Sequence, residues 1–199
     1  MTPLPAPDVP LPLVIVTGLP RSGTSLVMSL LAAGGHPILE DHRRAPDPDN
    51  PRGYYEFEPV KSLMRDNTWL HAHAGQAIKI ISTLLPFIPP DLPLDVIWIQ
   101  RHLPEVLASQ STMLMRAGKP LAANPALLAT AFQKQTMATE AFLTRRPRTR
   151  VLALQHHELL QSPVQQISRL LDFLPSLQNE SKMLQTIDPA LHRQRLENI

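Results

Sequence analysis

The segment from residue 14 to residue 31 constrains the fold more than any other part of the chain. An apolar, β-branched run ends at Thr17, a loop with Gly18 and Gly23 follows, and a helical apolar pattern begins directly after it. This strand–loop–helix order is typical of phosphate-binding loops, because successive backbone N–H groups and a helix N-terminus together form an anion site. The sequence therefore predicts an anion-binding loop at the carboxyl end of a first strand.

The loop imitates that of the nucleoside triphosphatases, with one departure. Gly18 and Gly23 have the spacing of that loop, but Thr24 stands where the triphosphatases carry the lysine that reaches the β- and γ-phosphates. A loop without this lysine is poorly equipped to transfer a γ-phosphoryl group. It still suits a nucleotide whose terminal group is a different one.

Strands and helices are expected to alternate along the chain. Five apolar runs predict the strands of a mostly parallel sheet, at Leu13–Thr17, 36–39, 77–81, 96–100 and 150–155. Helical patterns lie between or after them, at Thr24–Ala33, 59–73, 104–117, Pro125–Arg145 and 163–174. Because such alternation implies right-handed crossovers, we predict a three-layer P-loop α/β fold with a central, mostly parallel sheet flanked by helices.

Length and composition indicate one globular domain. Of the 199 residues 43% are apolar and 18% charged, and the net charge of +2 predicts no binding of nucleic acid. No run of about 18 apolar residues occurs, so we expect no membrane span. Residues 1–12, which contain five prolines, are expected to be a disordered lead-in to a single domain at 13–199. The absence of cysteine excludes disulfides and thiolate metal sites and is compatible with a cytoplasmic location.

Residues at the ends of the predicted strands are the candidates for binding a ligand, because the ligand of an open α/β sheet lies at the carboxyl ends of its strands. Besides the first loop, this rule selects Lys79 and Ser82 in and after the third expected strand. It also selects Arg101 after the fourth and His156 after the fifth. Ser109 follows Arg101 by eight residues, in the early turns of the next predicted helix.

Two of these segments resemble motifs of the sulfotransferase family. Residues 19–25 (Leu-Pro-Arg-Ser-Gly-Thr-Ser) resemble its 5′-phosphosulfate loop. Residues 96–110 resemble its 3′-phosphate motif, in which an arginine ends a strand and a serine follows eight residues later. Segments 50–58, 151–160 and 187–195 resemble the bacterial branch of the family. The resemblance implies that the cofactor is 3′-phosphoadenosine 5′-phosphosulfate (PAPS) and that the product is adenosine 3′,5′-bisphosphate (PAP).

The resemblance also implies roles for individual residues. Arg21 stands where many members carry a catalytic lysine, and it would contact the transferred sulfuryl group. The 5′-phosphate would be held by backbone N–H groups of Ser22, Gly23, Thr24 and Ser25. Arg101 and Ser109 would bind the 3′-phosphate, for which a planar guanidinium is well suited. Arg193, in the late motif, is either a second arginine for this phosphate or a solvated charge.

A sulfotransferase also needs a base, because the acceptor must lose a proton. Lys79 matches a lysine of the family's third strand, but Ile81 stands where the cytosolic members carry a catalytic histidine. We therefore predict Glu56 as the base, with Glu58 as the alternative. Lys79 lies in an apolar strand, where its charge needs a partner anion or must reach the strand end.

These expectations combine into a predicted activity. The chain would transfer a sulfuryl group from PAPS to a hydroxyl or amine of a small molecule, glycan or peptide, without a metal ion. Two alternatives stay open: a degenerate nucleotide-binding module of the same fold, and a P-loop small-molecule kinase. The acceptor wall is expected in segments 41–53, 82–95 and 113–126, whose apolar residues either indicate a partly hydrophobic acceptor or belong to the core.

Overall fold

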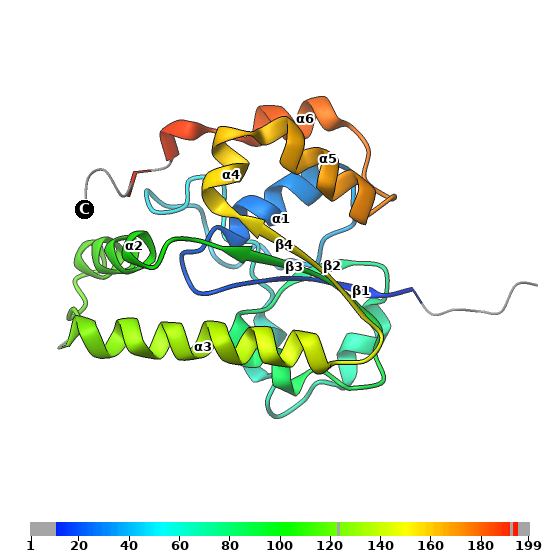
Figure 1. Ribbon diagram of the computed structural model, residues 1–199, viewed down its shortest axis with the longest axis horizontal. Coiled ribbons are helices and arrows are strands. Elements are labelled where there is room, and N and C mark those ends of the chain that lie inside the picture. The colour runs from blue at the N-terminus through cyan, green and yellow to red at the C-terminus, as the bar shows by residue number, and fades with distance from the viewer. Residues whose placement is uncertain (1–10, 123, 192, 195–199) are drawn as a thin grey trace, which may run out of the picture.

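A computed structural model describes residues 11–122, 124–191 and 193–194, so most of the predicted lead-in lies outside the described residues. In the described part, four parallel strands form one sheet in the order β2-β1-β3-β4. The strands are β1 (Leu13–Thr17), β2 (Ala77–Lys79), β3 (Leu94–Gln100) and β4 (Thr149–Gln155). Helices flank the sheet on both sides (Figure 1), which confirms the predicted α/β fold.

The helices divide between the two faces of the sheet. One face is covered by α1 (Thr24–Ala33), α4 (His156–Gln161), α5 (Pro163–Phe173) and α6 (Glu180–Thr186), and the other by α3 (Pro125–Arg145) (Figure 1). Short 3-10 segments complete the fold: η1 (Glu58–Ser62), η2 (Thr68–His73), η3 (Ser82–Phe87) and η4 (Pro189–Leu191). Within the described ranges, no helix has both the length and the apolar character needed to cross a membrane.

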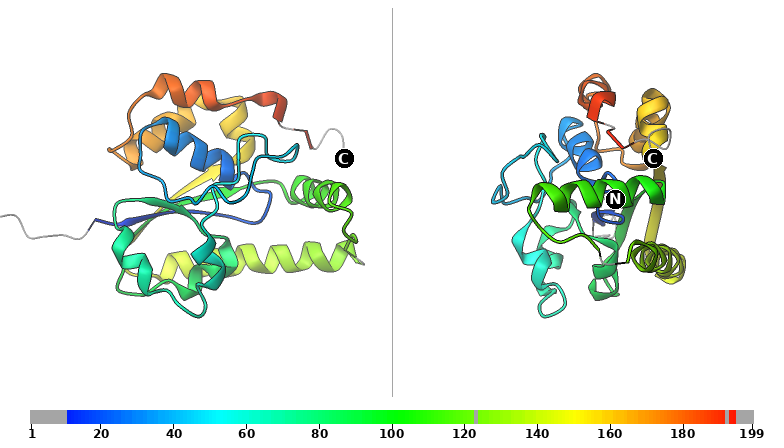
Figure 2. Two further views of the ribbon diagram at one scale, coloured as in Figure 1. Left: turned by 180° about the vertical axis from the view of Figure 1, so that it is seen from behind. Right: turned by 90° about the vertical axis from the view of Figure 1, so that its left-hand side faces the viewer.

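Helix α2 (Leu103–Arg116) has a different position from the others. It follows β3 directly and crosses in front of the carboxyl ends of the strands, as the right-hand view of Figure 2 shows. The edge of the sheet at which ligands bind in such folds is therefore bordered by α2.

The core lies on both faces of β1, which is buried along its whole length. Val14 and Val16 pack into the cluster that contains α1 and α5, whereas Leu13 and Ile15 pack into the cluster that contains η3 and α3. Successive side chains of a strand point to opposite faces, so a strand covered on both sides needs apolar residues at every position. This requirement explains the continuous apolar run of the sequence.

Two predicted elements differ from the structure. The expected strand at 36–39 forms only an isolated parallel bridge between Ile38 and Ala77, because Pro37 has no N–H with which to continue the ladder. The expected helix at 59–73 is instead the two 3-10 segments η1 and η2. Asp66 interrupts it, since its carboxylate accepts hydrogen bonds from the N–H and the hydroxyl of Thr68 at 3.1 and 2.7 Å.

Candidate active site

The loop at residues 18–23 joins β1 to α1 at the carboxyl edge of the sheet, as predicted. Gly23, the residue before the first turn of α1, has a left-handed φ of 108°. A Cβ added there would lie 2.7 Å from Cδ2 of His156. Helix α1 has no side-chain cap and no acidic residue in its first turn. Its first N–H groups, at Thr24 and Ser25, are therefore available to an anion at the positive end of the helix dipole.

Gly18 packs this loop against the neighbouring strand. An added Cβ would lie 2.4 Å from Oγ of Ser22 and 2.5 Å from the carbonyl oxygen of Ile99 in β3. We expect Gly18→Ala to lower the free energy of unfolding by about 3 kcal/mol, because the backbone of a central strand has little room to move. For a chain of this size, that corresponds to a fall in melting temperature of about 9 °C in calorimetry.

Gly118→Ala is the matched control for this prediction. Its added Cβ would meet no described atom within 4 Å, and the substitution costs only the strain of a φ of 62°, about 1 kcal/mol. Equal losses of stability in the two variants would contradict the tight packing of Gly18.

A cavity of about 400 Å³ opens beside the loop, between α2 and the segments at 44–56, 186–191 and 193–194. Its lining brings together nearly all of the predicted site residues: Arg21, Gly23, Thr24, Ser25, Glu56, Lys79, Arg101, Ser109 and Arg193. Ser22 is the exception: its N–H donates to the carbonyl oxygen of Leu19 at 3.2 Å, and the residue is 1% exposed. Its N–H is therefore used inside the loop.

Arg21 connects the loop to two other walls of the cavity. Its Nε donates to Oγ of Ser109 on α2 at 3.0 Å, and its Nη2 donates to the carbonyl oxygen of Asp49 at 3.1 Å. The backbone of Arg21 has a left-handed φ of 68°, a conformation that is costly for a residue with a side chain. Arg21 and Ser109, 88 positions apart in the sequence, thus lie side by side.

Arg101 lies in a buried ion pair at the start of α2. Its Nε donates to Oε2 of Glu105 at 2.7 Å, and the two side chains are only 9% and 3% exposed. Its Nη1 and Nη2 donate to the carbonyl oxygens of Arg21 and Gln194 at 3.3 and 2.8 Å. These contacts use three of the five N–H groups of a guanidinium, so two have no partner among the described residues.

Glu56 faces two cations within the cavity. Its Oε1 lies 3.0 Å from Nη1 of Arg44 and 3.8 Å from Nζ of Lys79. Lys79 also donates a hydrogen bond to the carbonyl oxygen of Tyr54. Glu58, the alternative base, lies outside the cavity lining and pairs with the exposed Lys61 at 2.7 Å. The structure therefore brings Glu56, and not Glu58, together with the other predicted residues.

Burial lowers the pKa of Lys79 to about 8, although the nearby carboxylate of Glu56 raises it. We expect Nζ of Lys79 to titrate near pH 8 in NMR spectra of lysine-labelled protein. Glu56→Gln is expected to lower this midpoint further, whereas Glu58→Gln leaves it in place. A Lys79 midpoint near its ordinary pKa of 10.5 would contradict the burial.

The same shift makes stability depend on pH. The amine of Lys79 has a lower pKa in the folded than in the unfolded state, so the unfolded state binds more protons between about pH 8 and 10.5. Lys79 is therefore expected to make the free energy of unfolding rise with pH in this window. Lys79→Met should remove this part of the pH dependence in urea titrations.

Several residues of the cavity were not identified from the sequence. The guanidinium of Arg44 lies 3.2 Å from the centre of the Tyr54 ring and lines the cavity, as do Asp49 and Arg116. Burial, together with a hydrogen bond to Asp47, raises the pKa of Tyr54 to about 12. These residues lie on irregular segments or at a helix end, where no periodicity predicts the direction of a side chain.

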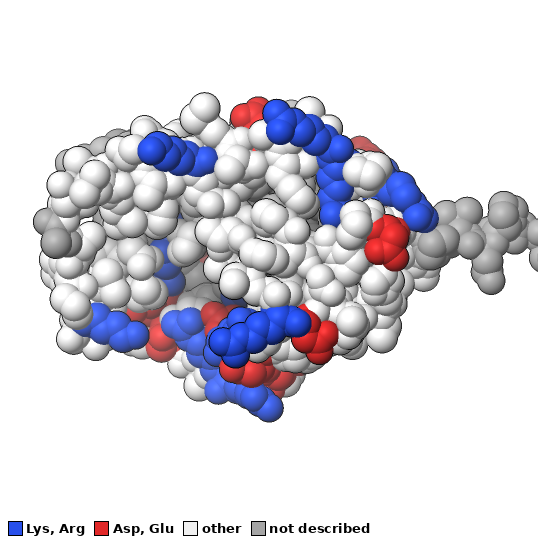
Figure 3. Space-filling view, turned by 90° about the horizontal axis from the view of Figure 1, so that it is seen from below, with Lys and Arg blue, Asp and Glu red and all other residues white. Residues whose placement is uncertain are grey.

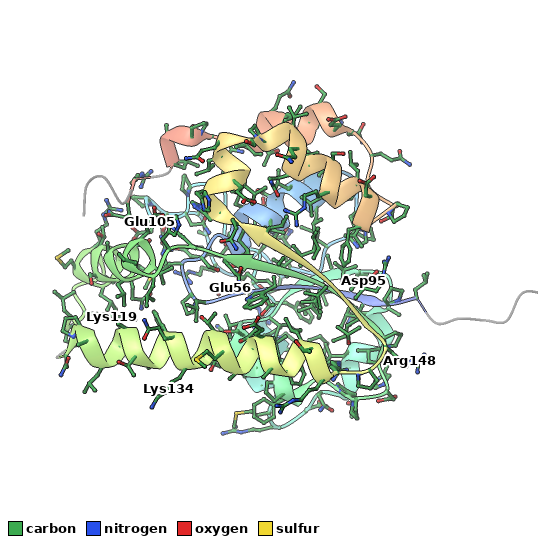
Figure 4. The ribbon with its side chains drawn as sticks, viewed as in Figure 1. Glu56, Asp95, Glu105, Lys119, Lys134 and Arg148 are labelled. Atoms are coloured by element: carbon green, nitrogen blue, oxygen red, sulfur yellow. The ribbon has the colours of Figure 1, made fainter. Side chains whose placement is uncertain are left out.

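Glu105 could have been found, because it follows Arg101 by four residues, the spacing at which oppositely charged side chains meet on a helix. Figure 4 shows Glu105 at the start of α2 and Glu56 nearer the centre of the molecule.

The face seen in Figure 3 carries acidic and basic side chains next to one another along one edge, and not one large patch of a single sign.

The predicted acceptor wall is only partly present. Met113 and residues 49–52 line the cavity, but its described lining includes none of residues 82–95. Leu85 and Ile88 are buried in the core cluster of β1 and β3, so they belong to the core and give no indication of a hydrophobic acceptor.

The sheet, the loop and the cavity at the carboxyl edge define a P-loop-type α/β fold. No family model and no curated protein matches the sequence. Similar folds occur among solved structures of sulfotransferases. The sulfotransferase domain from the curacin biosynthetic pathway has 19% identity and a TM-score of 0.56, covering 89% of this chain and 78% of that one.

Two further solved structures of sulfotransferases have a similar fold. A sulfotransferase from Alicyclobacillus acidocaldarius has 15% identity and a TM-score of 0.55, covering 90% of this chain and 87% of that one. Mouse sulfotransferase SULT7A1 complexed with PAP has 15% identity and a TM-score of 0.52, covering 88% of this chain and 62% of that one. The chain therefore has the fold of sulfotransferases.

Proposed function

We propose that the protein transfers a sulfuryl group from PAPS to a hydroxyl or amine of an acceptor. This proposal rests on one observation: anion-binding groups and a carboxylate line the same cavity. Arg21, Arg101 and the uncapped start of α1 lie on the same cavity as Glu56 and Lys79. Such a donor set fits a nucleotide with two separate anionic groups, because helix N-termini and arginines both favour phosphate and sulfate.

The cavity residues divide between the two ends of the nucleotide. The N–H groups of Thr24 and Ser25, with Arg21, would hold the 5′-phosphosulfate. The free N–H groups of Arg101 and the hydroxyl of Ser109 would hold the 3′-phosphate. Arg193, which lines the cavity and donates to the carbonyl oxygen of Pro48, would add a further positive charge.

Glu56 would act as the general base. Both of its cationic neighbours approach Oε1, so Oε2 can accept the proton of the acceptor. Arg21 and Lys79 supply positive charge to the same cavity, where negative charge develops during transfer. Bound PAPS supplies the activated sulfuryl group and leaves as PAP.

Incubation of the purified protein with ³⁵S-labelled PAPS and a panel of alcohols, phenols, amines, glycans and peptides tests this proposal. We expect one labelled product for each PAP released. Binding of PAP without transfer to any acceptor in the panel would favour the degenerate module. Phosphoryl transfer from ATP and Mg²⁺ would favour the kinase.

A further inference from the structure

A rigid turn places Asp49 in the proposed cofactor cavity. Oδ1 of Asp47 accepts hydrogen bonds from the N–H groups of Asp49 and Asn50 at 2.8 and 2.9 Å, and Pro48 fixes one backbone angle of the turn. The hydroxyl of Tyr54 donates to the other oxygen of Asp47 at 2.7 Å. The side chain of Asp49 is only 11% exposed, so its carboxylate lies inside the cavity.

Arg116 pairs with this carboxylate, with Nη1 lying 2.5 Å from Oδ1 of Asp49. Arg116 is the last residue of α2 and lines the same cavity as Ser109, Thr112 and Met113. Spacings of three, four and seven residues place these side chains on one face of the helix. Arg116 therefore lies on the face of α2 that carries the proposed ligand of the 3′-phosphate.

Two more arginines contact the same turn. Arg21 donates to the carbonyl oxygen of Asp49 at 3.1 Å, and Arg193 donates to the carbonyl oxygen of Pro48. These two acceptors are neutral, whereas the carboxylate of Asp49 carries a full charge. Asp49 thus supplies an anion inside a cluster of arginines, which is the interaction that a nucleotide phosphate would make.

We propose that Arg116 is a further ligand for the nucleotide at its 3′-phosphate end, and that the carboxylate of Asp49 competes with that phosphate for it. This inference rests on the proposed function. Binding of PAP must either displace the carboxylate of Asp49 from Arg116 or leave the 3′-phosphate close to that carboxylate, which repels it. In both cases Asp49 lowers the affinity of the site, and Arg116 raises it.

Calorimetric titration with PAP tests this inference in the wild-type protein, in the variants Asp49→Asn and Arg116→Gln, and in two control variants. Asp49→Asn keeps the size of the side chain and is expected to bind PAP about tenfold more tightly, since it removes one like charge close to the phosphate. Arg116→Gln is expected to bind about tenfold more weakly. Glu58→Gln and Lys119→Gln are the controls, because these charges lie outside the cavity lining, and their dissociation constants should match the wild type.

Titration with adenosine 5′-monophosphate, which lacks the 3′-phosphate, shows whether the changes in affinity depend on that phosphate. We expect its affinity to change less than twofold in Asp49→Asn and in Arg116→Gln. The inference is overturned if PAP binds Asp49→Asn no more tightly than wild type, if Arg116→Gln does not weaken binding, or if the monophosphate responds as strongly as PAP. A wild-type protein that does not bind PAP at all would reject the proposed function itself, and this inference with it.

Discussion

Replacing Arg101 by methionine is expected to weaken the binding of PAP about a hundredfold, because two charge-assisted hydrogen bonds to a phosphate are lost. The N–H groups of Arg101 that its internal partners do not use are the ones proposed for this contact. Calorimetric titration of PAP measures the change directly.

The ion pair with Glu105 complicates this variant and also provides its control. The side chain of Glu105 is 3% exposed, so removing the arginine beside it is expected to cost about 3 kcal/mol of stability. The double variant Arg101→Met with Glu105→Gln replaces both charges and should recover most of that loss while still binding PAP weakly. A double variant that binds PAP as tightly as wild type would exclude Arg101 from the nucleotide site.

Replacing Glu56 by glutamine is expected to lower the rate of sulfuryl transfer about a thousandfold, which is within the usual contribution of a general base. Glutamine has the shape of glutamate but cannot accept the proton of the acceptor at neutral pH. The affinity for PAP should change less than about threefold, because Glu56 has no proposed contact with the nucleotide. The substitution removes only one negative charge from the cavity. Release of PAP in the presence of an acceptor that wild type sulfates gives the rate.

Glu58→Gln is the matched control, since it removes a carboxylate two residues away that pairs with Lys61 at the surface. Its transfer rate should equal that of wild type. Wild-type rates in Glu56→Gln, or equal losses in the two variants, would contradict the assignment of Glu56 as the base.

The centre of the sheet could be predicted from the sequence because its two central strands lie between covering layers. β1 and β3 are buried almost throughout, so their apolar runs are continuous and their positions are unambiguous. The segment at 36–39 has a similar but shorter run, and Pro37 limits it to a bridge. The 3-10 segments could not be predicted, because side-chain hydrogen bonds such as those of Asp66 decide between them and an α-helix.

The site could be predicted where topology fixes it. Arg21, Lys79 and Arg101 lie at or near the carboxyl ends of β1, β2 and β3, which meet at one edge of the sheet. The side chains of segment 40–56 could not be placed, since that segment has no regular structure and its course depends on local turns. The pairing of Asp49 with Arg116 joins residues 67 positions apart and has no signal in one sequence.

The central claim is that this cavity binds a 3′-phosphorylated adenine nucleotide and not a nucleoside triphosphate. Calorimetric titration of the wild-type protein with PAP, and separately with ATP and Mg²⁺, tests it most directly. We predict binding of one PAP per chain, with ATP and Mg²⁺ at least about a hundredfold weaker, because Thr24 replaces the lysine that a triphosphate requires. Tighter binding of ATP and Mg²⁺ than of PAP, or no binding of PAP, would contradict it.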